Sequence, residues 1–318
     1  MQQRAVLAID IGGTKLAAGV VDEEGRVLEY RRAPNPNPPG GEGESVLRAL
    51  FALVDELDTD RSYFTGVGVG CGGPMNWPSG EVSPLNIPSW RDFPLRARLT
   101  EEFGLPVRVH NDAICVAVAE HWRGAGMGVD NVLGMVVSTG VGGGLILGGR
   151  LIDGATGNAG HIGHAIVHEF EPQCRCGAIG CLEAIASGPN LSAWAHGQGW
   201  RAGHSPEQRT GQDLVEDARR GDPIALTAMR RAGRALGIGI ATATTLCDLQ
   251  VVAIGGGLSQ AGPLLFDPLE ASLRERIGLE YARAVRVVPA GLGQESGLVG
   301  AAALILRPER YWSADDKD

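Results

Sequence analysis

The sequence predicts an α/β fold made of two related units that face each other. Near its start, the chain runs through a strand, a glycine-rich turn, a second strand, another turn and a third strand. This order begins again about 125 residues later. After each copy, short apolar runs alternate with segments whose apolar residues recur at helical spacing. A chain of 318 residues is long enough for two domains or one large α/β unit.

The first copy begins with an apolar run over Ala5–Asp10, which predicts a buried strand that stops at a glycine turn. Two further strands, Lys15–Val21 and Arg26–Arg31, are expected to be joined by a turn. After a Pro/Gly loop at 34–43, the predicted elements are helices at 44–57, 95–103 and 113–121 and strands at 66–70 and 107–110.

The second copy begins with the apolar strand Val132–Val137. Ser138–Gly144 predicts a glycine turn, and Leu145–Leu147 and Arg150–Ile152 predict two short strands after it. The later predicted elements are helices at 182–187, 212–220, 224–246, 264–277 and 297–306 and strands at 251–254 and 285–288. We expect a small α/β domain over 1–120, completed by the segment 299–318, and a larger domain over 121–298.

Composition narrows the function classes. Hydrophobic residues make up 44% and charged residues 20%, which is typical of a globular protein. The net charge of −9 and the lack of a basic stripe argue against nucleic acid as a partner. The N-terminal apolar stretch soon reaches Asp10, which is unlike a secretory signal, and no run of about 18 apolar residues predicts a membrane span. We therefore expect a cytoplasmic protein.

The first glycine turn contains candidate phosphate-binding residues. These are Asp10, Gly12, Gly13, Thr14 and Lys15. Glycines leave backbone N–H groups free to face phosphate oxygens, and Thr14 adds a hydroxyl donor. Asp10 is a candidate for holding Mg²⁺ through water, since Mg²⁺ keeps most of its waters. The alternative is an ordinary β-turn in which aspartate and glycine serve only the backbone.

Two more glycine-rich segments follow predicted strands. Their candidate residues are Thr139, Gly140, Gly142 and Gly143 in the second unit's first turn, and Gly256 and Gly257 between a strand and a helix. A glycine turn before a helix is a place where a nucleotide can lie against the backbone. One such turn is weak evidence, but three at strand ends favour nucleotide binding.

The tripeptide His110-Asn111-Asp112 ends a predicted strand and opens a helix. Asp112 fits two interpretations. It can be the N-cap of the helix, or a general base at a strand end, where ligands gather in α/β proteins. Asn111 can bond a ligand hydroxyl or its own turn.

A cluster of metal-binding residue types follows. His164, Cys174, Cys176 and Cys181 offer one imidazole and three thiolates, which suit a closed, tetrahedral, structural zinc site. The alternative is that the cysteines are small buried hydrophobic residues, which three cysteines within eight residues make a poor explanation. Glu183 follows the last cysteine and is either a surface charge or a carboxylate that binds a polyol.

Taken together, these motifs resemble the ROK family of sugar kinases and sugar-responsive repressors. The matching segments are DIGGTK at 10–15, GCGGPM at 70–75, LNIPSW at 85–90, HNDA at 110–113, STGVGGG at 138–144, GNAGHIGH at 157–164, CRCGAIGCLE at 174–183 and IGGGLS at 254–259. The resemblance implies an actin-like, ribonuclease H-type two-domain kinase with ATP and a sugar in a central cleft. It also implies a homodimer.

The resemblance assigns roles to individual residues. Asp112 would be the catalytic base, and the four-residue cluster would bind zinc. The residues implied to bind the sugar are Asn86, Asn111, Asp112, Asn158, His161, His164 and Glu183. His164 would serve both sites, with one ring nitrogen on zinc and the ring edge toward the sugar.

His161 departs from the family pattern, in which hexose kinases have glutamate at this place. A carboxylate only accepts hydrogen bonds, whereas imidazole can also donate. The resemblance implies phosphorylation of a hexose, with the 6-hydroxyl of glucose foremost, and His161 is the reason to keep an alternative acceptor. An N-acetylhexosamine, such as N-acetylmannosamine or N-acetylglucosamine, or a less common polyol remains the alternative. Ser138, where glycine is more usual, is a smaller departure.

A non-catalytic, sugar-sensing regulator is the other class considered. Repressors of this family carry a helix-turn-helix segment ahead of the DIGGTK-like region. Only nine residues precede Asp10 here, which are too few for such a segment, and the negative charge opposes DNA binding.

Overall fold

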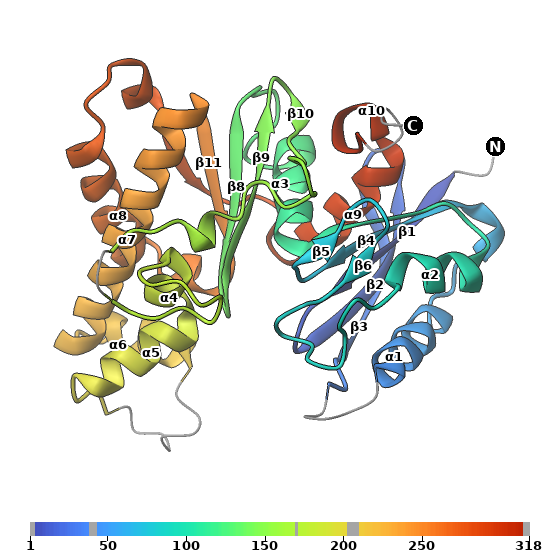
Figure 1. Cartoon of the computed structure of the whole chain (residues 1–318), viewed down its shortest axis with the longest axis horizontal. Helices are drawn as coiled ribbons and strands as arrows, with labels where there is room; N and C mark the ends of the chain where they lie inside the picture. Colours follow the sequence, from blue (N-terminus) through green and yellow to red (C-terminus); the bar gives the residue numbers. More distant parts are fainter. Residues whose placement is uncertain (1–3, 38–42, 169–170, 202–209, 314–318) are drawn as a thin grey trace. The chain divides into compact units, whose positions relative to one another are not determined.

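The computed structural model describes residues 4–37, 43–168, 171–201 and 210–313. The described chain divides into two units (Figure 1). The first contains residues up to 128, 144–160 and those from 292 onward, and the second contains 129–143 and 161–291. The domain limits expected from the sequence, and the central cleft, stay predictions.

The first unit is built on a five-stranded sheet of order β3-β2-β1-β4-β7. Its strands are β1 (Ala5–Ile11), β2 (Lys15–Asp22), β3 (Val27–Pro34), β4 (Phe64–Cys71) and β7 (Val107–Asn111). β1 is antiparallel to β2 and parallel to β4, which is in turn parallel to β7. The carboxyl ends of β1, β4 and β7 therefore meet at one edge of the sheet.

Helices cover the sheet because its strands are apolar on both faces. Alternate residues of β1, such as Leu7 and Ile9, pack in one core with α1 (Glu44–Asp55) and α2 (Leu95–Phe103). α9 (Ser296–Leu306), from the end of the chain, packs against β1 and β4 and against α3 (Asp112–Arg123) (Figure 1). The short elements η1 (Arg61–Tyr63), β5 (Met75–Asn76), β6 (Glu81–Val82), β10 (Arg150–Leu151) and α10 (Pro308–Tyr311) complete this unit.

The second five-stranded sheet has the order β10-β9-β8-β11-β12. Its other strands are β8 (Val132–Val137), β9 (Val141–Leu147), β11 (Val251–Gly255) and β12 (Arg286–Pro289). In both sheets the order is third, second, first, fourth and fifth strand along the chain, and the fourth strand is parallel to the first. The predicted repeat and the mixed α/β fold are confirmed.

Helices of the second unit pack around the long helix α7 (Pro223–Cys247). Its partners are α4 (Leu182–Ala186), α5 (Gly188–Gly197), α6 (Gly211–Arg219) and α8 (Pro263–Arg276). Asp222 caps α7 by accepting the backbone N–H groups of Ile224 and Ala225. The remaining short elements near the predicted site are η2 (Ile162–His164) and η4 (Gly257–Ala261).

Two details differ from the sequence-based expectation. The predicted glycine turn Ser138–Gly144 is too long, because β9 already begins at Val141. A side chain at Gly144 would lie 2.9 Å from Cβ of Ala117, so glycine serves the close packing of strand on helix there, and not a turn. α5 was not predicted. Part of the predicted loop at 34–43 and the end of the segment 299–318 lie outside the described residues.

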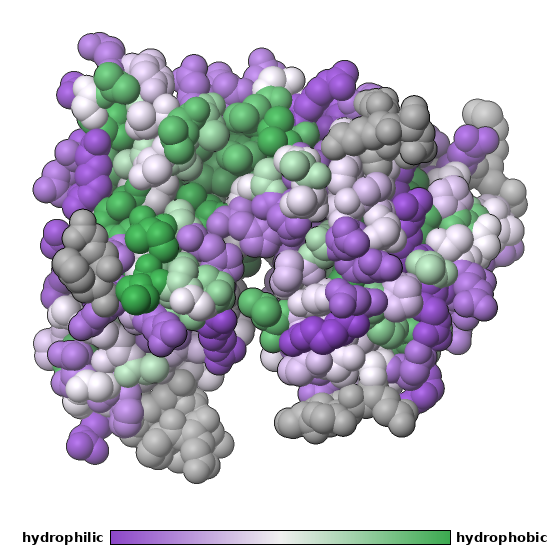
Figure 2. All heavy atoms as spheres, viewed as in Figure 1, coloured by the Kyte–Doolittle hydropathy of each residue, from purple (hydrophilic) through white to green (hydrophobic). Residues whose placement is uncertain are grey.

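Within the described part of the chain, no helix is long and apolar enough to cross a membrane. On the face drawn in Figure 2, hydrophilic residues cover much of the surface, and apolar residues gather in one area in the upper left half of the view.

Candidate functional site

Two carboxylates lie at strand ends on the same edge of the first unit's sheet, with the end of β4 between them. Asp10 pairs with Gly70 across β1 and β4, and Gly70 pairs with His110 across β4 and β7. A Cβ built on Gly70 would lie 3.6 Å from both Asp10 Oδ1 and the Cα of Asp112. The parallel strands thus bring the two predicted residues, Asp10 and Asp112, to one edge of the sheet.

The environment of Asp10 disfavours its charged form. Burial, and then the nearby charge of Asp112, raise the pKa of Asp10 to about 7, while Arg32 opposes the shift. A carboxylate held beside a second carboxylate is a fitting ligand for a divalent cation, because the cation offsets the repulsion between the two. The role of Asp10 toward Mg²⁺ stays a prediction.

Asn111, and not Asp112, is the N-cap of α3. Its Oδ1 accepts the backbone N–H of Ala113 at 3.0 Å, so one alternative left open by the sequence is wrong. Asp112 is the first residue of the helix, and its Oδ1 also accepts the Ala113 N–H, at 2.8 Å. The cap and this bond hold the Asp112 carboxylate at the positive end of the helix dipole.

The first glycine turn is closed by the Gly12 N–H, which donates to the Lys15 carbonyl at 2.9 Å. Asn86 lies against this turn, since a Cβ on Gly13 would approach within 2.7 Å of Cβ of Asn86. Asn35 Nδ2 donates to the carbonyl oxygen of Gly12, and Asn37 Nδ2 donates to that of Asn86, both at 2.7 Å.

No role was predicted for Asn35 or Asn37. They stand in the segment Asn35-Pro36-Asn37, which composition marks only as loop. Their amides contact the glycine turn and the Asn86 segment, so both residues support the first unit's share of the predicted site.

Asn158 also belongs to the first unit. Its amide nitrogen donates to the Met75 carbonyl at 3.2 Å and to the Thr156 carbonyl at 2.9 Å. These bonds fix the loop that precedes η2 against the start of β5.

In the second unit, the structure brings two glycine-rich segments together. A Cβ on Gly256 would lie 2.4 Å from the Val137 carbonyl oxygen, and one on Gly257 would lie 3.8 Å from Ser138 Oγ. The Ser138 carbonyl accepts the N–H of Gly188, the first residue of α5, at 2.8 Å. Of the predicted nucleotide-binding residues, Thr139 and Gly140 lie in the turn before β9, whereas Gly142 and Gly143 lie within that strand.

The predicted metal ligands form one cluster. One ligand atom from each of His164, Cys174, Cys176 and Cys181 lies within 4.8 Å of all the others. Cys176 Sγ and Cys181 Sγ are 3.6 Å apart, and Cys174 Sγ is 3.8 Å from His164 Nδ1. Tetrahedral zinc with Zn–S bonds of about 2.3 Å would require sulfur atoms about 3.8 Å apart. The geometry therefore fits zinc.

The other predicted sugar-binding residues of the second unit lie around this cluster. The rings of His161 and His164 are parallel within 17°, with centroids 6.2 Å apart. Glu183 is in the first turn of α4, directly after Cys181, and its Oε2 accepts the Val141 N–H at 2.9 Å. A Cβ on Gly140 would lie 2.7 Å from the same oxygen.

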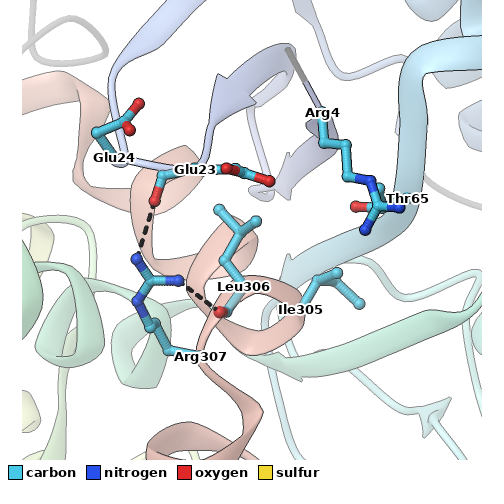
Figure 3. Close-up of a pocket in the computed structure, with 7 residues that line it drawn as sticks. All are labelled: Arg4, Glu23, Glu24, Thr65, Ile305, Leu306 and Arg307. Atoms are coloured by element: carbon cyan, nitrogen blue, oxygen red, sulfur yellow. Dashed lines mark hydrogen bonds between the residues drawn. The ribbon is translucent and has the colours of Figure 1, made fainter. Parts of the chain in front are cut away.

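A pocket of about 430 Å³ in the first unit is distinct from these residues (Figure 3). Its lining includes Arg4, Thr65 and Arg307, near the amino ends of β1 and β4. Asp10 is six residues along β1 from Arg4, about 20 Å at the rise of a strand. Arg307 donates to the Glu23 and Leu306 carbonyl groups. None of the residues that line this pocket is a predicted site residue.

The sequence profile of the ROK family matches residues 6–307. The chain belongs to the ROK family. The actin-like fold expected from the motifs is confirmed by solved ROK structures. The crystal structure of a ROK family glucokinase from Streptomyces griseus, in complex with glucose and AMPPNP, superposes with a TM-score of 0.82 at 37% identity. The matched region spans 94% of this chain and 98% of the Streptomyces griseus chain.

Curated relatives within the ROK family are sugar kinases. The glucokinase of Streptomyces coelicolor is 35% identical over 318 residues, covering 95% of this chain and 98% of its own length. The N-acetylmannosamine kinase of Shigella flexneri is 36% identical over 302 residues, covering 94% and 97%. The chain is accordingly an ATP-dependent sugar kinase.

Proposed function

We propose that the chain transfers the γ-phosphoryl group of ATP to a hydroxyl of a hexose or N-acetylhexosamine, with Asp112 as the catalytic base. The observation that carries this proposal is the pair of carboxylates, Asp10 and Asp112, which lie on either side of the end of β4 at one edge of the first unit's sheet. The two have separate tasks, because Asp10 stands two residues before Gly12 of the glycine turn and Asp112 begins a helix.

Asp112 accepts the proton of the attacking hydroxyl. The Ala113 N–H on its Oδ1 limits its rotation, so the carboxylate is oriented before the sugar binds. Phosphoryl transfer has a loose transition state, and the base mainly orients the hydroxyl and takes its proton late. Asn86, Asn111 and Asn158 offer amide groups to sugar hydroxyls from the same unit.

Asp10 would hold Mg²⁺, and the glycine turns would hold the phosphates. Bound Mg²⁺ offsets phosphate charge during transfer. The Gly12 N–H closes the turn, and Gly13, Thr14 and Lys15 supply N–H, hydroxyl and ammonium groups to phosphate oxygens. In the second unit, Thr139, Gly140, Gly142 and Gly143 and the η4 pair Gly256 and Gly257 supply the backbone against which the nucleotide lies.

The zinc cluster is proposed as structural. Four ligands leave no open position for substrate or water. Its effect on the sugar comes through His164, which is a ligand, and through Glu183, which follows Cys181. We also propose a homodimer, which light scattering after gel filtration would report as about twice the mass of one chain.

The candidate acceptors are glucose and an N-acetylhexosamine, such as N-acetylmannosamine or N-acetylglucosamine, and His161 favours the N-acetylhexosamine. An imidazole N–H can donate to the acetamido carbonyl of an N-acetylhexosamine, an acceptor that glucose lacks. A glutamate at this place could only accept a hydrogen bond, as suits a sugar hydroxyl. A donor that pairs with one sugar and not with the other shifts the ratio of kcat/KM between the two sugars.

The test is ADP release from Mg-ATP with glucose, mannose, fructose, N-acetylglucosamine and N-acetylmannosamine. The proposal expects turnover with N-acetylmannosamine above that with glucose. Turnover with glucose alone would remove the role given to His161. Folded, zinc-loaded protein that binds a sugar but releases no ADP with any of them would favour the regulator instead.

A further inference from the structure

A buried histidine–aspartate pair lies behind the base-bearing strand end. We propose that His110 and Asp153 form a positioning pair, which holds the backbone of Asn111 and Asp112 and ties it to the loop that carries Asn158. The inference rests on the proposed function, because it assigns the pair a role in the same phosphoryl transfer.

The pair is fixed by direct contacts. His110 is fully buried at the end of β7, and Asp153, just after β10, is 4% exposed. His110 Nε2 is 2.9 Å from Asp153 Oδ1, and the Asn111 N–H donates to His110 Nδ1 at 2.9 Å. Since Nδ1 accepts, it has no proton. The proton is therefore on Nε2 and is donated to the carboxylate.

The imidazole thus bridges two parts of the first unit. On one side it accepts from the peptide N–H between itself and Asn111, the residue that caps α3 in front of Asp112. On the other side its Nε2–H donates to Asp153, the first residue of the loop 153–160. A shift of the ring moves both the base and this loop, as second-shell partners do for metal ligands.

The loop is packed against the same ring system. Trp77 lies beside His110, with ring centroids 6.2 Å apart. A Cβ on Gly157 would lie 2.2 Å from Cβ of Trp77, so the loop passes directly over this tryptophan. Asn158 follows, with its amide on the Met75 carbonyl. The acceptor-binding asparagine is therefore supported by the pair and its aromatic neighbour.

The end of the described chain completes the arrangement. Ser313 Oγ donates to Asp153 Oδ2 at 2.8 Å, and the Trp312 ring lies edge-on to His110 with centroids 6.5 Å apart. Both Asp153 oxygens thus have a donor, as a buried carboxylate requires. Asp153 therefore connects His110 and Ser313, which are 43 and 160 residues away from it along the chain.

The test compares Asp153→Ala, Asp153→Asn and His110→Gln with wild type. Asp153→Ala removes the acceptor of the Nε2 proton, and His110→Gln removes the acceptor of the Asn111 N–H. We expect kcat to fall about 10- to 100-fold in both, with the KM for Mg-ATP within about twofold of wild type. Asp153→Asn keeps an acceptor oxygen and should restore most of kcat.

Tyr311→Phe is the matched control. It removes a buried hydrogen bond of 2.7 Å between Tyr311 Oη and His121 Nδ1, near the other end of α3. At 1.5 Å per residue this bond is about 14 Å from Asp112 along the helix. We expect a lower melting temperature and unchanged kcat. An equal loss of kcat in this control would overturn the positioning role.

A double variant separates positioning from stability. In Asp112→Asn protein, adding Asp153→Ala should lower kcat no further, because the pair acts through the base. Ser313→Ala, a milder change, replaces Asp153→Ala if that variant does not fold. Additive losses, or wild-type kcat in Asp153→Ala, contradict the inference while the kinase assignment stands.

If the wild-type protein phosphorylates no sugar, the proposed function fails instead of the positioning role. Nitrogen NMR of His110 still tests the pair: an Nδ1 proton contradicts it.

Discussion

Glu183 Oε2 accepts the backbone N–H of Val141 across 2.9 Å. One side of this bond is the first turn of α4, directly after the predicted zinc ligand Cys181. The other side is the first residue of β9, directly after the turn that holds Thr139 and Gly140. The bond therefore connects the metal cluster with a predicted nucleotide-binding turn inside the second unit.

Gly140→Ala tests the position of Glu183. The new methyl group would lie 2.7 Å from Glu183 Oε2, too close for contact, so the carboxylate must move. We expect the KM for the sugar to rise about tenfold, which corresponds to about 1.4 kcal/mol, with zinc content unchanged. Gly197→Ala, where nothing lies near the added carbon, is the control. Equal KM values in both variants would show that Glu183 does not bind the sugar.

Cys176→Ser tests the metal cluster. We expect wild type to contain about one zinc per chain by mass spectrometry of the metal, and the variant to contain little, because a hydroxyl is a poor zinc ligand. The KM for the sugar should rise as His164 and Glu183 lose their support. Cys247→Ser changes a cysteine outside the cluster and should keep the metal. Metal-free wild type with full activity would remove the cluster from the account.

The raised pKa of Asp10 predicts a pH-dependent stability without metal. Between about pH 4 and 7 the unfolded chain has released this proton and the folded chain has kept it. Folded protein thus binds more protons, so its free energy of unfolding falls as pH rises through this window, by up to about 1.4 kcal/mol per pH unit.

Urea unfolding in EDTA measures this effect. Asp10→Asn has no proton to release at this position, so its free energy of unfolding should fall less across the same window. Curves that stay parallel from pH 4 to 7 would show that Asp10 ionises in the folded protein as it does in the unfolded one.

His161→Glu tests acceptor choice. We expect kcat/KM for N-acetylmannosamine to fall at least tenfold and that for glucose to rise, since a donor is replaced by an acceptor. His168→Glu makes the same change of charge at an exposed histidine of the second unit and should leave the ratio unchanged. An unchanged ratio in His161→Glu would mean that another residue selects the sugar.

The local sequence pattern was sufficient to predict most of the strands and the residues that form the metal cluster. Ala5–Asp10 is a continuous apolar run beside a turn, and β1 ends at Ile11, one residue later. The cysteines are close in the chain, so proximity in the fold follows from their spacing. The two glycine-turn units were visible because each repeats the same order of strands.

Contacts between distant segments were not readable from pattern. Gly142–Gly144 resembles a turn by composition, but the three residues lie in β9, and Gly144 serves packing that depends on the position of α3. Asn111 and Asp112 are both good capping residues, and only the backbone geometry decides between them. Asp153 and Ser313 have no local signal, since their partners are far away in sequence.

Asp112→Asn tests the central claim most directly. The amide has the shape of the carboxylate but cannot take a proton, so kcat should fall about 10³-fold with the circular dichroism spectrum unchanged. The measurement is formation of ADP and phosphosugar from Mg-ATP and N-acetylmannosamine or glucose, for wild type and variant side by side. The account predicts equal amounts of both products from wild type and almost none from the variant. Phosphosugar formation by Asp112→Asn at the wild-type rate would contradict it.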